Sequence, residues 1–130
     1  MITITKQFEF AAAHLLPYHK GLCKNLHGHS YKLEITVGKR LKDLLFEDAS
    51  IENFPSKGMV MDFSDLKKIV KEKAIDFLDH KYLNSVIYNP TAELLVIEIR
   101  GLICNEIEKY GRLLRIRLWE SSTSYAEWKA

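Results

Sequence analysis

Strict alternation of apolar and polar residues over residues 29–38 is the feature that most limits how this chain folds. Residues two apart point to the same side of a strand, so the apolar side chains share one face. The segment therefore predicts a β-strand with one buried and one polar face, which a second layer must cover. The apolar residues are Tyr31, Leu33, Ile35 and Val37.

Two other segments show helical periodicity. The first helix follows Ser64, a suitable N-cap, with Asp65 in its first turn. The second begins at residues 89–90, with proline at the first helical position, and Gly111 is a suitable C-terminal cap. The apolar stripes are Leu66, Ile69, Val70, Ala74 and Phe77 in the first helix, and Leu95, Ile99, Leu102, Ile103, Ile107 and Tyr110 in the second.

The order of elements is two strands, two helices and two strands (ββααββ), with a loop over residues 13–28. It predicts an α+β fold, a four-stranded antiparallel sheet with two helices on one face. Residues 1–130 are expected to form a single domain. The strands are predicted over residues 2–12, 29–38, 113–119 and 124–128.

Residues 39–57 are predicted to be an excursion between strands. Leu41, Leu44, Leu45 and Phe46 are spaced for a helical turn, whereas Pro55, Ser56 and Gly58 mark a loop.

Composition narrows the class of protein. Of the 130 residues, 47% are hydrophobic and 28% charged, which is typical of a globular chain. The net charge of +2 without a long basic block argues against nucleic acid as a partner, and no apolar run is long enough for a membrane span. Two cysteines in different settings, with no secretory signal, predict free thiols and a cytoplasmic location.

Three histidines form a candidate metal site. His27 and His29 are two residues apart, so in a strand both imidazoles point the same way. His14 ends the first strand, where an antiparallel partner places it beside the start of the second. Three nitrogen ligands suit Zn²⁺ and leave one coordination position open, as in catalytic zinc sites.

Cys23 admits two functions. It is a reactive thiol close to a metal, or a fourth zinc ligand that would close the site and make it structural. Cys104 lies within the apolar pattern of the second helix and is predicted to be a small core residue.

Two further features carry acids. Asp79 precedes His80 near a helix end, where the pair is either a surface cap or a proton-transfer dyad. Glu120 ends a strand and is either solvated or able to hold a flat guanidine-like edge by two parallel hydrogen bonds.

Together the motifs resemble those of the 6-pyruvoyl-tetrahydropterin synthase family, and most of all its 6-carboxytetrahydropterin synthase branch of the queuosine pathway. The resemblance covers nearly the whole chain in the right order. It rests on Phe10 to His14, Cys23 to His29, Gly58 to Phe63, Leu78 to Asn84, Asn89 to Glu93 and Trp119 to Ser121.

The resemblance implies a role for each site residue. His14, His27 and His29 match zinc ligands, and Cys23 matches the catalytic thiol. Asp79 and His80 match its partner dyad, and Glu120 matches the acid that anchors the pterin. The family fold is the tunnelling fold, in which subunits form a trimeric barrel and two trimers stack into a hexamer.

The implied enzyme is a carbon–oxygen lyase that converts 7,8-dihydroneopterin triphosphate to 6-carboxy-5,6,7,8-tetrahydropterin, triphosphate and acetaldehyde. Lys20 and Lys24 are candidate triphosphate contacts by charge alone. One alternative is a 6-pyruvoyl-tetrahydropterin synthase, which eliminates triphosphate without cleaving the side chain. An alternative of another class is a non-catalytic pterin- or metal-binding module with a closed zinc site of three histidines and Cys23.

Overall fold

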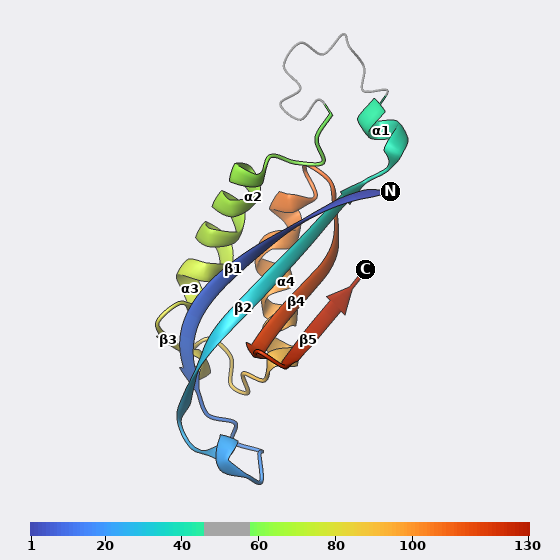
Figure 1. The fold of residues 1–130 in the computed structure, drawn as a ribbon. Helices are drawn as coiled ribbons and strands as arrows, with labels where there is room; N and C mark the ends of the chain where they lie inside the picture. The colour runs from blue at the N-terminus through green and yellow to red at the C-terminus, as the bar shows by residue number, and fades with distance from the viewer. Residues whose placement is uncertain (46–57) are drawn as a thin grey trace.

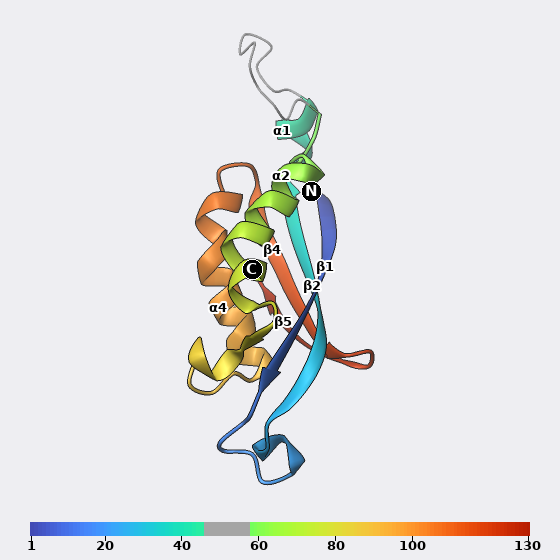
Figure 2. The same ribbon diagram turned by 90° about the vertical axis from the view of Figure 1, so that its left-hand side faces the viewer.

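The computed structural model describes residues 1–45 and 58–130 of the chain. Its centre is a sheet with the long helices packed on one face (Figures 1 and 2). The strands lie in the order β3-β1-β2-β4-β5. Their bounds are β1 Ile2–His14, β2 His27–Lys39, β3 Lys81–Tyr82, β4 Arg112–Ser121 and β5 Ser124–Lys129.

The helices are α1 Leu41–Leu45, α2 Phe63–Val70, α3 Asp76–Leu78 and α4 Ala92–Ile107. A π-helical turn over Lys71–Ile75 joins α2 to α3, and 3-10 turns cover Leu22–Lys24 and Leu83–Ser85. The helical turn predicted near residue 41 is α1, whereas Phe46, Pro55 and Ser56 lie outside the described residues. No helix within residues 1–45 and 58–130 is long and apolar enough to span a membrane.

All four predicted strands are present and pair antiparallel. The prediction missed β3, which pairs parallel to the free edge of β1 through Ala12 with Lys81 and Ala13 with Tyr82. The sheet is therefore mixed and five-stranded. A strand of two residues is too short to produce a periodic pattern, and the sequence gives no sign of it.

The face of the sheet toward the helices forms the core. Tyr31, Leu33, Ile35 and Val37 are at most 1% exposed, as the alternation predicts. Phe10 of β1 stacks on Tyr31 with ring centroids 4.9 Å apart. Both helical segments cover these side chains with buried residues, which are Leu66, Val70, Ala74, Ile75, Leu78, Leu95, Val96, Ile99, Ile103 and Ile107.

The helix ends differ from the predictions because side-chain caps decide them. Asp62, not Ser64, caps α2, since its carboxylate accepts the Ser64 backbone N–H at 2.7 Å. Thr91 caps α4, so Pro90 lies outside the helix. Gly111 does not adopt a left-handed C-cap; a Cβ there would lie 3.0 Å from the Gly38 carbonyl oxygen, so close packing requires glycine.

Phe77 was predicted to be buried but is 56% exposed, while Leu78 is fully buried. The π-helical turn over Lys71–Ile75 inserts an extra residue into the helical repeat. Residues after it are rotated relative to an α-helical pattern, so the buried position moves from Phe77 to Leu78.

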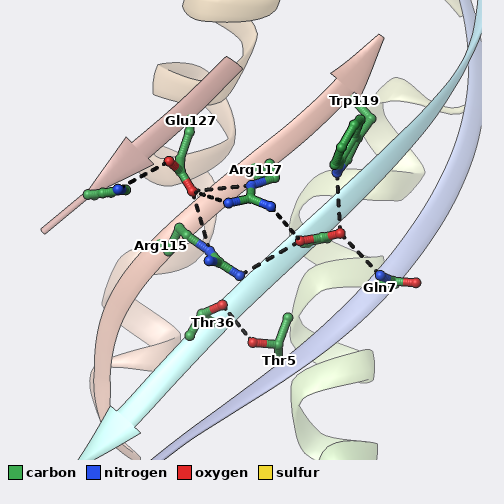
Figure 3. Close-up of polar contacts among 9 residues, drawn as sticks. Thr5, Gln7, Thr36, Arg115, Arg117, Trp119 and Glu127 are labelled. Atoms are coloured by element: carbon green, nitrogen blue, oxygen red, sulfur yellow. Dashed lines mark hydrogen bonds and ion pairs between the residues drawn. The ribbon is translucent and has the colours of Figure 1, made fainter. Parts of the chain in front are cut away.

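The helix-free face of the sheet carries paired polar and charged side chains (Figure 3). Glu34, only 7% exposed, accepts hydrogen bonds from Gln7 and from the indole N–H of Trp119. Arg117 donates to Glu127 at 3.0 Å and lies 3.9 Å from Glu34. This face is therefore polar, and its charged side chains lie close to partners of opposite charge on the same face.

Candidate functional site

The three histidines converge where β1 ends and β2 begins. The antiparallel register pairs His14 with His27 and Ala12 with His29, as the sequence predicts. All three side chains lie on the core face of the sheet, beyond the Phe10–Tyr31 stack. Their ring nitrogens lie within 4.8 Å of one another, so together they can hold a metal ion.

Backbone carbonyls fix the tautomers of two of these rings. Nδ1 of His14 donates to the Pro90 carbonyl at 2.8 Å, and Nδ1 of His27 donates to the Asn25 carbonyl at 2.7 Å. A carbonyl only accepts, so in each neutral ring the proton is on Nδ1 and Nε2 carries a lone pair. These two Nε2 atoms face each other at 2.9 Å.

Two facing lone pairs have no proton to share, and a cation between them relieves the repulsion. His29 adds a third nitrogen, since its Nε2 is buried without a hydrogen-bond partner. Nitrogen ligands about 2.0–2.1 Å from a tetrahedral metal lie about 3.4 Å apart, inside the range that this cluster spans. The three residues therefore fit a metal ion.

Glu120 reaches the same point from the end of β4. Its Oε1 lies 3.4 Å from Nε2 of both His14 and His29. The carboxylate is 31% exposed, so it borders the cluster on the side that faces solvent.

Burial favours the uncharged forms of His14 and His29. It lowers the pKa of His14 and of His29 below the ordinary value of 6.5, and this effect outweighs the nearby Glu120 carboxylate, which raises both. Neutral imidazole is the form that binds metals, so the environment favours binding. Burial also raises the pKa of Tyr31, whose hydroxyl lies 3.4 Å from Nδ1 of His14 and stays protonated.

Asp79 and His80 form a dyad beside β1. The Asp79 Oδ1 lies 2.9 Å from His80 Nδ1 and accepts the Ala11 backbone N–H at 3.0 Å. The latter bond, above all, holds the pKa of Asp79 below its usual range. His80 adopts a φ of 57°, donates its own N–H to the Ala11 carbonyl and leaves its side chain 82% exposed.

An open groove of about 540 Å³ is lined by His29 of the three-histidine cluster and by His80. A larger hollow of about 840 Å³ lies at the opposite end of the sheet, around Gly38 and Arg112. None of the predicted site residues lines the larger hollow, whereas two of them line the smaller groove.

Cys23 lies in the 3-10 turn of the loop that extends past the end of the sheet (Figure 1). It is half-buried and free, and the Leu16 N–H donates to its carbonyl. Among the described residues, the group able to hold a metal contains only the three histidines. The structure thus does not place Cys23 as a fourth ligand. Cys104 packs against the core, as predicted.

Sequence reasoning missed the groups that orient His14. The Pro90 carbonyl accepts Nδ1–H of His14, and the Asn84 side chain accepts the backbone N–H of Leu15, the next residue. Backbone carbonyls leave no trace in a sequence pattern, and a single asparagine in a loop gives no signal of its own.

The fold and the site together define a small α+β protein in which three histidines are positioned to hold a metal ion, with an Asp–His pair beside β1. A profile of the 6-pyruvoyl tetrahydropterin synthase family matches residues 3–130. The chain belongs to this family and is an enzyme, a lyase of the tetrahydropterin synthase type.

Relatives agree in sequence and in fold. The chain is 35% identical to the 6-carboxy-5,6,7,8-tetrahydropterin synthase of Haemophilus influenzae over 99% of both chains. It is 38% identical to the protein of that name from Synechocystis sp., over 98% of this chain and 93% of the relative. The structure of Caenorhabditis elegans 6-pyruvoyl tetrahydropterin synthase matches with a TM-score of 0.72 at 21% identity, covering 99% of this chain and 95% of that chain. The tunnelling fold is thereby confirmed.

The depressed pKa values of His14 and His29 predict how the stability of the metal-free protein varies with pH. Below pH 6.5 the unfolded chain binds protons that these buried rings do not, so the free energy of unfolding falls as pH falls from 6.5 toward 5. The loss is at most about 1.4 kcal/mol per pH unit for each histidine. Urea denaturation in the presence of EDTA measures it.

A double variant, His14→Gln with His29→Gln, should flatten this dependence. His19→Gln changes an exposed histidine in the neighbouring loop and should leave it intact. If the free energy of unfolding fell equally steeply with pH in the native protein and in the double variant, His14 and His29 would not be the source of the pH dependence.

Proposed function

We propose that the protein converts 7,8-dihydroneopterin triphosphate and water to 6-carboxy-5,6,7,8-tetrahydropterin, with release of triphosphate and acetaldehyde, in the queuosine pathway. The observation that carries the proposal is the three-histidine cluster with its two facing, unprotonated Nε2 atoms. The names of the relatives from Haemophilus influenzae and Synechocystis sp. support this reaction over others of the family.

We assign Zn²⁺ to the cluster, held by His14, His27 and His29. Three neutral nitrogen ligands are the set that zinc takes in catalytic sites, where a fourth position stays open. When bound, the ion would act as a Lewis acid on the hydroxyl groups of the substrate side chain and make the adjacent C–H protons more acidic.

Cys23 is assigned as a base that removes a proton from the substrate side chain. Its loop is joined directly to both ligand-bearing strands and is closed by the hydrogen bond from Leu16 to the Cys23 carbonyl. The half-buried thiol stands between Leu22 and Lys24, and Lys20 and Lys24 remain the candidates for contact with the triphosphate.

His80 is assigned as the second proton-transfer group. The Asp79 carboxylate accepts a hydrogen bond from Nδ1–H of His80. Nε2 is then the ring atom that exchanges protons with the substrate. The exposed His80 ring lines the 540 Å³ groove that His29 also lines, so a substrate in this groove meets both groups.

Glu120 is assigned to the pterin ring. A carboxylate can accept two parallel hydrogen bonds from the amino and ring N–H groups of a pterin, as it does from arginine. Its position 3.4 Å from two ligand nitrogens would fix the ring next to the metal site.

We also propose that the chain, as a single domain over residues 1–130, works as a cytoplasmic homo-oligomer, a hexamer built from two trimeric barrels. Large apolar side chains are exposed in the loop between β1 and β2 and in the segment before α4, as expected of surfaces that a neighbouring subunit covers. They are Tyr18, Leu22, Leu26 and Tyr88, with 63–87% of their surface exposed.

The proposed reaction is tested by incubating the zinc-loaded protein with 7,8-dihydroneopterin triphosphate and identifying every product by mass. We expect 6-carboxytetrahydropterin, triphosphate and acetaldehyde in equal amounts. A 6-pyruvoyl product without acetaldehyde would replace the proposal with the pyruvoyl synthase. Binding without turnover would support the non-catalytic module.

Cys23→Ala should retain zinc and lose turnover by at least a factor of about 100, because general base catalysis contributes about 10²–10⁴-fold. Metal analysis and product formation measure the two effects separately. Cys104→Ala makes the same chemical change on α4 and should retain both zinc and turnover. Loss of zinc from Cys23→Ala would contradict the base assignment and favour the closed site.

A further inference from the structure

Asn84 lies outside every role assigned above, yet its side chain contacts the backbone next to a proposed metal ligand. Its Oδ1 accepts the Leu15 backbone N–H at 3.0 Å, and its Nδ2 donates to the Leu15 carbonyl at 2.9 Å. Leu15 directly follows His14. The side-chain amide therefore binds both polar groups of one residue, as a neighbouring strand would.

Leu15 lies where both strand ladders have ended. The β1–β2 pairing stops at His14 with His27, and the β1–β3 pairing stops at Ala13 with Tyr82. Within the part of the chain that the structure describes, neither ladder reaches Leu15. Unpaired backbone groups in a partly buried site are costly, so the amide of Asn84 takes the place of a strand partner for Leu15, two residues beyond the last β1–β3 pair.

The same amide also holds the segment that fixes the His14 tautomer. Nδ2 of Asn84 donates to the Tyr88 carbonyl at 3.3 Å. Two residues later, the buried Pro90 presents the carbonyl that accepts Nδ1–H of His14 at 2.8 Å. Asn84 thus connects the backbone that carries His14 to the loop that orients its ring.

From this geometry we propose that Asn84 is a positioning residue for the metal site, and that it sets the orientation of His14 toward the metal through Leu15 and the loop over residues 84–90. The proposal rests on the proposed function to the extent that the cluster binds zinc. Asparagine suits the position because its amide has the acceptor and the donor of a peptide group.

The test compares variants by zinc affinity, measured by competition with a chelator, and by the visible spectrum of the cobalt(II) form. Asn84→Ala should weaken zinc binding by about 10–100-fold, the usual effect of removing a group that orients a ligand. Its cobalt spectrum should shift, since the bands report ligand geometry. Asn89→Ala removes the same amide in the same loop, where its side chain has no hydrogen bond among the described residues, and should match the native protein.

The variant Asn84→Asp distinguishes the hydrogen bonds that the Asn84 amide donates from its contribution to packing, because it keeps the size of the side chain. The isosteric variant keeps an acceptor for the Leu15 N–H but cannot donate to the Leu15 and Tyr88 carbonyls. It should lose zinc affinity at least as strongly as Asn84→Ala, and it carries the test if the alanine variant does not fold. Native affinity and an unshifted cobalt spectrum in either folded Asn84 variant would overturn the proposal.

A measurement without metal distinguishes this inference from the proposed function. In the metal-free native protein, Nδ1–H of His14 should give a slowly exchanging imidazole proton signal by NMR, and the signal should persist in Asn89→Ala. It should broaden or vanish in both Asn84 variants. Failure of the native protein to bind zinc would remove the proposed zinc site, whereas an unchanged His14 signal in the variants would remove the role of Asn84.

Discussion

The pairing of β1 with β2 is the interaction on which the site depends. Its register runs without a break from Ile2 opposite Lys39 to His14 opposite His27. Because side chains alternate, a shift of one residue would place His27 and His29 on the opposite face from His14. The same register buries Tyr31 and the apolar residues that follow it, so the core fixes the metal site.

The site extends the core face, and its chemistry follows from that. The buried strand ends take His14 and His29 out of water, which disfavours their charged forms. The Pro90 and Asn25 carbonyls accept the Nδ1 protons of His14 and His27, so these protons point away from the centre of the cluster. The Nε2 lone pairs of these two rings therefore face inward, and the pair of His80 with Asp79 lies outside the cluster, with the His80 side chain exposed.

Much of this could be predicted from the sequence, because period-two alternation and antiparallel pairing are local and geometric. These two rules predicted the long strands and the position of His14 beside the start of the second strand, where His27 lies. The errors arose where a single contact decides: the cap at Asp62, the π-helical turn that exposes Phe77, and the two-residue β3. The groups around His14 were missed because they are backbone carbonyls and one loop side chain, which only the tertiary fold brings together.

Zinc stoichiometry tests most directly whether His14, His27 and His29 form one metal site. The purified protein, stripped with chelator and dialysed against zinc, should hold one ion per chain by elemental analysis. His27→Ala should hold none, while His19→Ala, an equal change in the adjacent exposed loop, should still hold one. Full zinc content in His27→Ala, or equal loss in both variants, would contradict the site described here.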